Sequence, residues 1–245
     1  QVVVADTQIA LGLLAAHVRR QRDVCVIGIT GSHGKTTVKT LLAGILARVA
    51  PTHASSGSFN NEIGLPLTLL SMPEDTRFAV LEMGAGKPGD IDYLAAIAQP
   101  RIALVNNVAP AHLERMGSLD GGAATKGAIY SALPADGIAV INADDAYAGF
   151  FAGLAGSRRV IRFGVNTQAE VMARFDKAAP ANAFTLLAAG EEIDITLPLL
   201  GRHNVNNALA AASLALGVNV PLAAIKQGLE AASAVAGRSA QRKHA

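Results

Sequence analysis

A glycine-rich loop stands between an apolar run and a helical pattern in the stretch VCVIGITGSHGKTT, residues 24–37. Gly31 and Gly34 would let the backbone wrap an anion, and a helix beginning near Lys35 would direct free N–H groups toward the same point. Lys35 could reach the β and γ phosphates of a nucleotide, and the Thr36 hydroxyl could bind Mg²⁺. The usual pattern G-x-x-x-x-G-K-S/T would place glycine at position 29, which is isoleucine here. The stretch predicts a phosphate site, with a plain glycine turn as the alternative.

Titratable side chains follow two other apolar runs. Glu82 comes near the end of FAVLEMG, where a strand-end carboxylate could hold Mg²⁺ opposite Thr36. His112 follows the run RIALVNNV, and Lys126 lies farther along the chain. Each has a simpler interpretation when taken singly, because a lone histidine is usually structural and a lone lysine is usually solvated.

Paired amides are the third group of candidate residues. Asn60 and Asn61 lie in a loop in the stretch SFNNEIGLPLTLL, where they could bind a substrate or simply form a turn. Asn204 and Asn207 lie at the start of a predicted helix in GRHNVNNALAA. An amide side chain could pair with the edge of an adenine, although Asn204 would also serve as an ordinary helix N-cap.

The elements that would position these residues alternate between strands and helices. Apolar runs rich in Val and Ile predict strands at 24–29, 78–84, 101–108, 137–144 and 159–165. Helical patterns cover 35–50, 89–98, 125–133, 144–154, 204–216 and 221–232. The stretches AEVMARFD and AFTLLAAGEEIDITLPL are expected to form strands joined by turns, and residues 2–20 a strand and a helix capped by Asp6 or Thr7. We therefore predict an α/β fold, with a mostly parallel P-loop sheet flanked by helices and a small antiparallel section toward the C-terminal part.

Composition excludes several classes of protein. The 245 residues are 51% hydrophobic and 16% charged, with a formal charge of +2 and no basic run, which argues against disorder and against a nucleic-acid partner. A lone cysteine, Cys25, excludes an internal disulfide and fits a reducing compartment. No apolar stretch is long enough to span a membrane and no signal pattern opens the chain, so we expect a cytoplasmic protein.

In their order along the chain, these motifs resemble one family. The stretches TGSHGKTT, NNEIGLPLT, LEMGAGKPGDI, NNVAPAHLERMGS, TKGAIYSALP, INADD and GRHNVNNALAA are similar to those of the Mur ligases, the ATP-dependent amide-forming enzymes of peptidoglycan synthesis. The resemblance covers most of residues 24–238. Within the family, NNEIGLPLT followed by LEMGAGKPGDI is most similar to the branch that joins D-Ala-D-Ala to UDP-N-acetylmuramoyl-tripeptide.

The resemblance implies a three-domain enzyme of which this chain holds the centre. Residues 1–21 would end an N-terminal UDP-binding domain or linker, 22–235 would form the central ATP-binding domain, and 236–245 would begin the linker to an absent C-terminal domain. ATP would phosphorylate the terminal carboxylate of UDP-N-acetylmuramoyl-tripeptide, and the amine of D-Ala-D-Ala would attack the acyl phosphate. The family is usually monomeric, so we expect a monomer.

The resemblance also implies a role for each candidate residue. Lys35, His112 and Lys126 would be catalytic, and Lys126 matches a family lysine that CO₂ carbamylates into a metal ligand. Two Mg²⁺ ions would be held by Thr36 and Glu82, and by His112 with carbamylated Lys126. ATP would contact Gly31, Ser32, His33, Gly34, Lys35, Thr36 and Thr37, with Asn204 and Asn207 facing the adenine and Asn60 and Asn61 on the muramoyl-peptide side. His33 departs from the small polar residue of the family pattern.

Two alternatives stay open. Another enzyme of the superfamily, such as a MurE-like ligase or a folylpolyglutamate synthase-like enzyme, would share the ATP site and accept different substrates. This chain alone could instead be a nucleotide-binding module with weak or no ligase activity, because the third domain is missing. The identity of the third peptide residue, diaminopimelate or lysine, is left open by the sequence.

Overall fold

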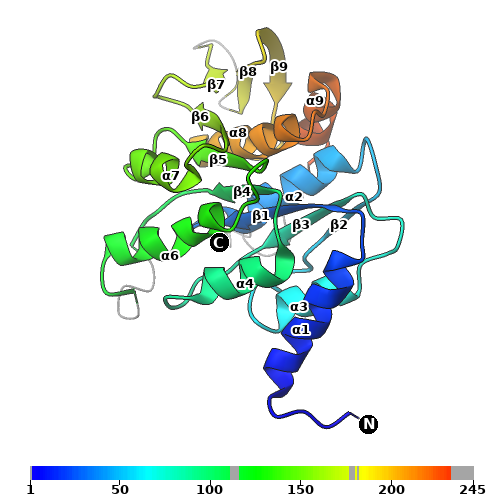
Figure 1. Cartoon of the computed structure of the whole chain (residues 1–245). Helices are drawn as coiled ribbons and strands as arrows, with labels where there is room; N and C mark the ends of the chain where they lie inside the picture. The colour runs from blue at the N-terminus through cyan, green and yellow to red at the C-terminus, as the bar shows by residue number, and fades with distance from the viewer. Residues whose placement is uncertain (1, 111–115, 177–179, 181, 233–245) are drawn as a thin grey trace, which may run out of the picture.

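A computed structural model of the chain describes residues 2–110, 116–176, 180 and 182–232. One sheet runs through this part in the order β2-β3-β1-β4-β5-β6-β7-β8-β9 (Figure 1). Neighbouring strands from β2 to β7 are parallel, whereas β8 is antiparallel to both β7 and β9. The strands are β1 (Cys25–Thr30), β2 (Thr52–Ala54), β3 (Phe78–Glu82), β4 (Ile102–Val105), β5 (Ile138–Asn142), β6 (Arg159–Gly164), β7 (Val171–Arg174), β8 (Ala183–Ala188) and β9 (Glu191–Thr196). The predicted fold class is confirmed, including the antiparallel section.

Helices cover both faces of the sheet (Figure 1). They are α1 (Thr7–Arg20), α2 (Lys35–Leu46), α3 (Gly64–Leu70), α4 (Asp90–Ala98), α6 (Leu119–Ser131), α7 (Ala148–Ala155), α8 (Arg202–Gly217) and α9 (Leu222–Glu230). Helices α2, α8 and α9 pack on one face, and α1, α3, α4, α6 and α7 lie on the other. Among the described residues, none of the helices combines the length and the hydropathy of a transmembrane segment.

Two apolar layers separate the sheet from its helices. Successive strand residues point to opposite faces, so Ile27 and Ile29 of β1 join the core beneath α2 and α8, whereas Val26 joins the core beneath α4 and α6. All three side chains are fully buried. Burial on both faces explains why the parallel strands are continuous apolar runs in the sequence instead of alternating ones.

Tyr130 of α6 makes hydrogen bonds to two central strands. Its ring is fully buried, and its hydroxyl donates to the Val140 carbonyl at 2.6 Å and accepts from the Val105 N–H at 2.9 Å. Burial raises the pKa of this phenol, so the hydroxyl keeps its proton and can fill both roles. The side chain thereby fixes α6 against β4 and β5, the strands that end beside the candidate site.

Several element predictions were wrong in detail. Residues 2–5 form no strand, and the first regular element is α1, which Asp6 caps by accepting from the Ile9 N–H at 2.9 Å. Strand β1 continues to Thr30, one residue beyond the predicted end at residue 29. Helix α6 begins at Leu119, earlier than predicted, because Ser118 caps it by accepting from the Gly121 N–H. Helix α7 begins later than predicted, at Ala148.

Candidate active site

The loop between β1 and α2 has the geometry of a phosphate-binding loop. Gly31 and Gly34 have φ angles of 144° and 79°, a region that L side chains rarely adopt. Gly34 is also the N-cap residue of α2. Because it has no side chain, it offers no side-chain acceptor to the first N–H groups of the helix. A Cβ atom on Gly34 would lie less than 3.0 Å from the amides of Asn106 and Asn207. The chain conformation and the crowding both require glycine there.

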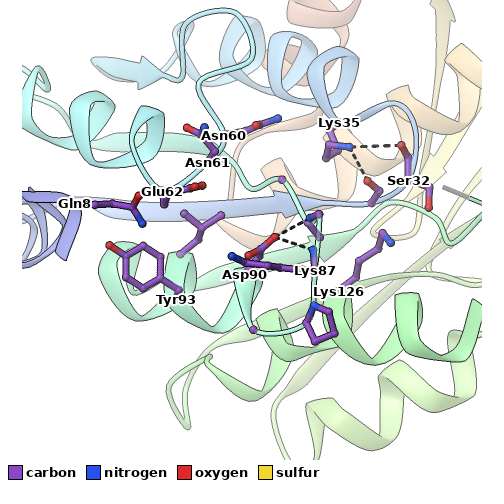
Figure 2. A pocket seen from close by; sticks show the side chains of 17 residues that line it. Gln8, Ser32, Lys35, Asn60, Asn61, Glu62, Lys87, Asp90, Tyr93 and Lys126 are labelled. Atoms are coloured by element: carbon purple, nitrogen blue, oxygen red, sulfur yellow. Dashed lines mark hydrogen bonds between the residues drawn. The ribbon is translucent and has the colours of Figure 1, made fainter. Parts of the chain in front are cut away.

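Lys35 folds back over this loop. Its Nζ donates to the Gly31 carbonyl at 2.7 Å and lies 3.5 Å from the Ser32 carbonyl (Figure 2). A lysine so placed has its charge at the point where the loop N–H groups and the positive end of α2 meet. This arrangement can bind the terminal phosphates of a nucleotide.

Ser32 and His33 hold the loop against the end of β4. The Ser32 hydroxyl donates to the Ala109 carbonyl at 3.0 Å and accepts from the Ala109 N–H at 2.9 Å. The His33 N–H donates to Asn107 Oδ1 at 2.9 Å, and the His33 carbonyl accepts from both Asn106 and Asn107. His33 is positioned by its backbone and its side chain is exposed, which accounts for the tolerance of histidine there.

Four side chains form a polar group at the head of α2, named here the Glu82 cluster: partly buried Thr36 and Asn60, and buried Lys39 and Glu82. Thr36 Oγ1 donates to Glu82 Oε2 at 3.0 Å, and Asn60 Nδ2 donates to Glu82 Oε1 at 2.8 Å. Lys39 Nζ lies 3.4 Å from Glu82 Oε2. The predicted pair of Thr36 and Glu82 is thus brought together, and Glu82 is only 2% exposed.

The Thr36 and Glu82 oxygens suit a hard divalent cation. Mg²⁺ in phosphate-transfer sites is usually held by one or two protein oxygens together with phosphates and water. Thr36 and Glu82 offer the protein oxygens of such a set. In the part of the chain that the structure describes, no group of three or more His, Cys, Asp or Glu residues could hold a metal by itself.

Lys126 approaches the loop from α6, a helix on the sheet face opposite to α2. It is 3% exposed and donates a long hydrogen bond of 3.5 Å to the Gly122 carbonyl. Burial, followed by repulsion from Lys35, lowers the pKa of its ammonium below the ordinary value. Lys126 and Lys35 line the same cavity (Figure 2). His112, the other residue predicted here, lies outside the described residues.

The amides of α8 reach the opposite side of the loop. Asn207 Oδ1 accepts from Asn106 Nδ2 at 3.0 Å, next to Gly34. The prediction of Asn204 as the N-cap was wrong: Gly201 caps α8, and the Asn204 amide donates to the Leu200 carbonyl at 2.8 Å from within the first turn. Asn204 Oδ1 accepts from Asn207 Nδ2 at 3.4 Å, so the two predicted amides do lie together.

Asn60 and Asn61 have separate positions. Asn60 belongs to the Glu82 cluster, whereas exposed Asn61 accepts from the Gly64 N–H at 2.8 Å at the start of α3. The sequence prediction treated this whole segment as a loop, and α3 was missed. Both asparagines still line a cavity of about 680 Å³ that opens from the phosphate-binding loop.

This cavity extends from the loop toward α1 and α4. Figure 2 shows Lys35, Ser32 and Lys126 at one end and Gln8, Glu62 and Tyr93 at the other. The wall between them is the segment after β3, residues 84–90. Asp90 shapes that wall by accepting from the Gly86 and Lys87 N–H groups at 2.8 and 2.9 Å. The cavity can hold a ligand that extends away from the phosphate position.

Comparison with known proteins assigns the chain to a family. A family model described as the Mur ligase middle domain matches residues 29–215, which is most of the chain. The chain belongs to the Mur ligase family. The phosphate-binding loop and the Glu82 cluster therefore lie in a Mur ligase middle domain, and the resemblance expected from the motifs is confirmed.

Named relatives of this Mur ligase chain share one activity in their names. This chain is 44% identical over 240 residues to the UDP-N-acetylmuramoyl-tripeptide–D-alanyl-D-alanine ligase of Escherichia coli. The match covers 97% of this chain and 53% of that protein. Against the Bacillus subtilis ligase of the same name, the identity is 37%, covering 86% of this chain and 45% of the relative. The chain spans about half the length of the curated relatives it matches.

Solved Mur ligase structures share the fold. A crystal structure of MurF from Acinetobacter baumannii aligns with a TM-score of 0.93 and 39% identity, over 97% of this chain and 52% of that one. MurF from Thermotoga maritima in complex with ADP aligns with a TM-score of 0.83 and 26% identity, over 97% of this chain and 55% of that one.

Sequence reasoning missed Lys39 and Asn106. Lys39 lies one turn after Lys35 on α2, and this spacing, which places both lysines on one helix face, was an available signal. Asn106 follows β4 directly, and amides at the carboxyl end of a parallel strand lie where ligands bind. Attention to strand ends would have found Asn106, whereas the burial of Lys39 depends on the loop at Gly57 and the end of β3.

Proposed function

We propose that this chain binds ATP with Mg²⁺ and forms the ATP-binding part of a ligase that joins D-Ala-D-Ala to UDP-N-acetylmuramoyl-tripeptide. The observation that carries the proposal is the phosphate-binding loop with Lys35 at its head and Thr36 against Glu82. The 44% identity to the E. coli ligase supports the choice of substrates, and the ADP complex of the Thermotoga relative supports the nucleotide.

In the proposed reaction, ATP phosphorylates the terminal carboxylate of the tripeptide, the dipeptide amine attacks the acyl phosphate, and phosphate leaves. Such phosphoryl transfer depends mainly on positioning and on neutralising charge. Lys35 would stabilise the charge on the transferred γ-phosphoryl group, and the loop N–H groups would orient the phosphates. Thr36 and Glu82 would hold Mg²⁺, which supplies further neutralisation of the phosphate oxygens when bound.

Lys126 is proposed to act after carbamylation. In this reaction the neutral amine attacks the carbon of CO₂ and loses a proton, which gives an N-carboxylate. The lowered pKa of buried Lys126 favours the neutral amine that this step requires. The product would be an anionic metal ligand for a second Mg²⁺, together with His112. Isotopically labelled bicarbonate should give a carbamate carbon signal in the NMR spectrum of the parent and none in Lys126→Met.

The two sides of the loop would separate the substrates. Asn207 lies beside Gly34 and Asn204 lies next to Asn207, on the side where the adenine of ATP would extend. The cavity toward Gln8 and Tyr93 lies on the other side, with Asn60 and Asn61 in its wall, and would receive the peptide end of the acyl substrate. The carboxylate to be phosphorylated would then meet the γ-phosphate near Lys35 and Lys126.

The test separates nucleotide binding from ligation. Calorimetric titration of ATP with Mg²⁺ into the chain should show binding, and Lys35→Ala should abolish or strongly weaken it. For ligation, a chimaera should be built in which this chain replaces the matching segment of the E. coli ligase. ADP release by the chimaera that requires both the tripeptide and the dipeptide supports the proposed reaction.

A second candidate function is a nucleotide-binding module without ligase activity. The observation that favours it is that the chain by itself supplies the glycine loop with Lys35 and the pair of Thr36 and Glu82, which nucleotide binding requires. ATP binding by the chain, together with a chimaera that hydrolyses ATP without forming the amide, would support this candidate instead.

A further inference from the structure

Lys39 is a buried cation on the helix that follows the phosphate-binding loop. It is 4% exposed, and its ammonium donates to the Gly57 carbonyl at 2.6 Å. A lysine is almost never this buried unless it is paired. Its pairing partner is Glu82, at 3.4 Å from Nζ to Oε2. Both side chains are nearly inaccessible, so water and salt screen their interaction only weakly.

Lys39 pairs with an oxygen of the carboxylate that is proposed to hold Mg²⁺. Glu82 Oε2 accepts from Thr36 Oγ1 at 3.0 Å and lies 3.4 Å from Lys39 Nζ. A cation bound between Thr36 and Glu82 would therefore share its carboxylate ligand with an ammonium. The hydrogen bond to the Gly57 carbonyl keeps the Lys39 ammonium beside Glu82.

The charges of the cluster make its metal affinity conditional. Glu82 carries one negative charge and Lys39 one positive charge, so the pair is neutral and offers a dication little net attraction. Nearby Lys35 adds a further positive charge at the head of α2. The phosphates of a nucleotide would reverse this balance, because each brings negative charge and oxygen ligands to the same place.

We propose that Lys39 is a positioning residue that serves as the resident counter-ion of Glu82. It keeps the carboxylate oriented toward Thr36 before the nucleotide arrives, and it prevents Mg²⁺ from occupying the site without phosphates. Metal and nucleotide therefore enter together. The inference rests on the proposed function, since it takes Thr36 and Glu82 as the metal site, but it is tested without ATP.

The experiment measures thermal unfolding of the chain with and without MgCl₂ in the absence of nucleotide. The parent should show no Mg²⁺-dependent change in Tm. Lys39→Met should unfold at a lower Tm without Mg²⁺, and Mg²⁺ at about ten times its Kd should raise that Tm by roughly 3–6 °C. The double variant with Glu82→Gln should lose this response, which would locate the ion at Glu82.

Lys226 provides the matched control. Like Lys39, it pairs with a glutamate, Glu230 at 3.1 Å, and donates to a backbone carbonyl, that of Asp194. It lies on α9, away from the phosphate-binding loop. Lys226→Met should show no response to Mg²⁺. A response there would mean that any lost ion pair creates a nonspecific Mg²⁺ effect, which would overturn the inference.

Two further outcomes would overturn it. One is calorimetric binding of Mg²⁺ to the parent chain without nucleotide at an affinity equal to that of Lys39→Met. The other is a Lys39→Met protein that is destabilised equally with and without Mg²⁺, which is the result of a purely structural role. If Lys39→Met does not fold in plain buffer, refolding with Mg²⁺ should recover it, and failure to do so counts against the inference. Titration of ATP with Mg²⁺ into the parent tests the proposed function separately.

Discussion

Asn106 and Asn207 share a buried hydrogen bond of 3.0 Å from Nδ2 to Oδ1, although 101 residues separate them in the chain. The same Asn106 amide donates to the His33 carbonyl at 3.0 Å. One side chain at the end of β4 therefore joins the phosphate-binding loop to α8. The phosphate and adenine sides of the proposed nucleotide site depend on a single polar network.

Asn207→Ala should weaken ATP binding and lower stability together. The substitution removes one of the two acceptors of the buried Asn106 amide, at a cost of about 1–3 kcal/mol in the free energy of unfolding. Calorimetry and urea unfolding measure the two effects. Asn182→Ala is the control, because Asn182 donates to the Leu197 carbonyl at 2.6 Å away from the loop. It should lose stability and keep the parent's affinity for ATP.

Lys35→Ala should reduce the affinity for ATP by about 10–100-fold, since a hydrogen bond between charged groups is worth roughly 1.5–3 kcal/mol. Titration of ATP with Mg²⁺ by calorimetry provides the measurement. Thermal unfolding of the variant verifies that it is folded. Unchanged affinity in a folded variant would contradict the assignment of Lys35 to the phosphates.

Gly34→Ala should be more damaging than Gly89→Ala. Both glycines are helix N-caps with similar φ angles, 79° and 88°, so both substitutions incur the left-handed penalty of about 1–2 kcal/mol. Only Gly34 is crowded, because a Cβ there would meet Asn106 and Asn207, whereas nothing lies within 4 Å of one on Gly89. Equal losses of Tm in the two variants would show that crowding at the loop is not important.

Lys126→Met should be more stable than the parent at neutral pH, with the difference narrowing as the pH rises toward 10.5. The pKa of buried Lys126 lies below its ordinary value of 10.5 in the folded chain and returns to that ordinary value on unfolding. Between the folded pKa and the unfolded pKa, the unfolded chain therefore binds more protons than the folded chain. Stability of the parent therefore rises with pH in that window. Urea unfolding in CO₂-free buffer over this range provides the measurement. A difference that is constant with pH would contradict the lowered pKa.

Tyr130→Phe should destabilise the chain by about 1–3 kcal/mol, because it leaves the buried Val105 N–H and Val140 carbonyl without their partner. Chemical denaturation measures the loss. Tyr147→Phe is the comparison, since the Tyr147 hydroxyl bonds Asp120 in an exposed position. Its effect should be smaller, as water can replace the lost hydrogen bond.

The parallel sheet and the loop could be predicted from the sequence because both depend on local signals. Buried strands need Val and Ile on both faces, and the loop needs glycines at residues 31 and 34, where φ is positive. Lys35 and Thr36 then follow from the register of the loop with α2. The position of Glu82 beside Thr36 could also be predicted, because the ends of adjacent parallel strands share one edge of the sheet.

The features that sequence reasoning missed depend on distant segments. Helix α3 is short and lacks a long periodic pattern, so its start at Gly64, fixed by the Asn61 side chain, was interpreted as a loop. Asn204 has a residue type typical of an N-cap, but Gly201, with φ of 96°, begins α8 earlier. The role of Lys39 requires the positions of Gly57 and Glu82, which only the folded chain brings together.

The contact between Asn106 and Asn207 also has a consequence for the order of assembly. During synthesis β1 and α2 emerge long before Asn207, which belongs to α8 near the end of the described chain. Contacts between segments so far apart in sequence form late and slowly. A nascent chain that stops before residue 202 carries the glycine loop without the helix that packs against α2. The proposed nucleotide site is therefore completed only when α8 has been made.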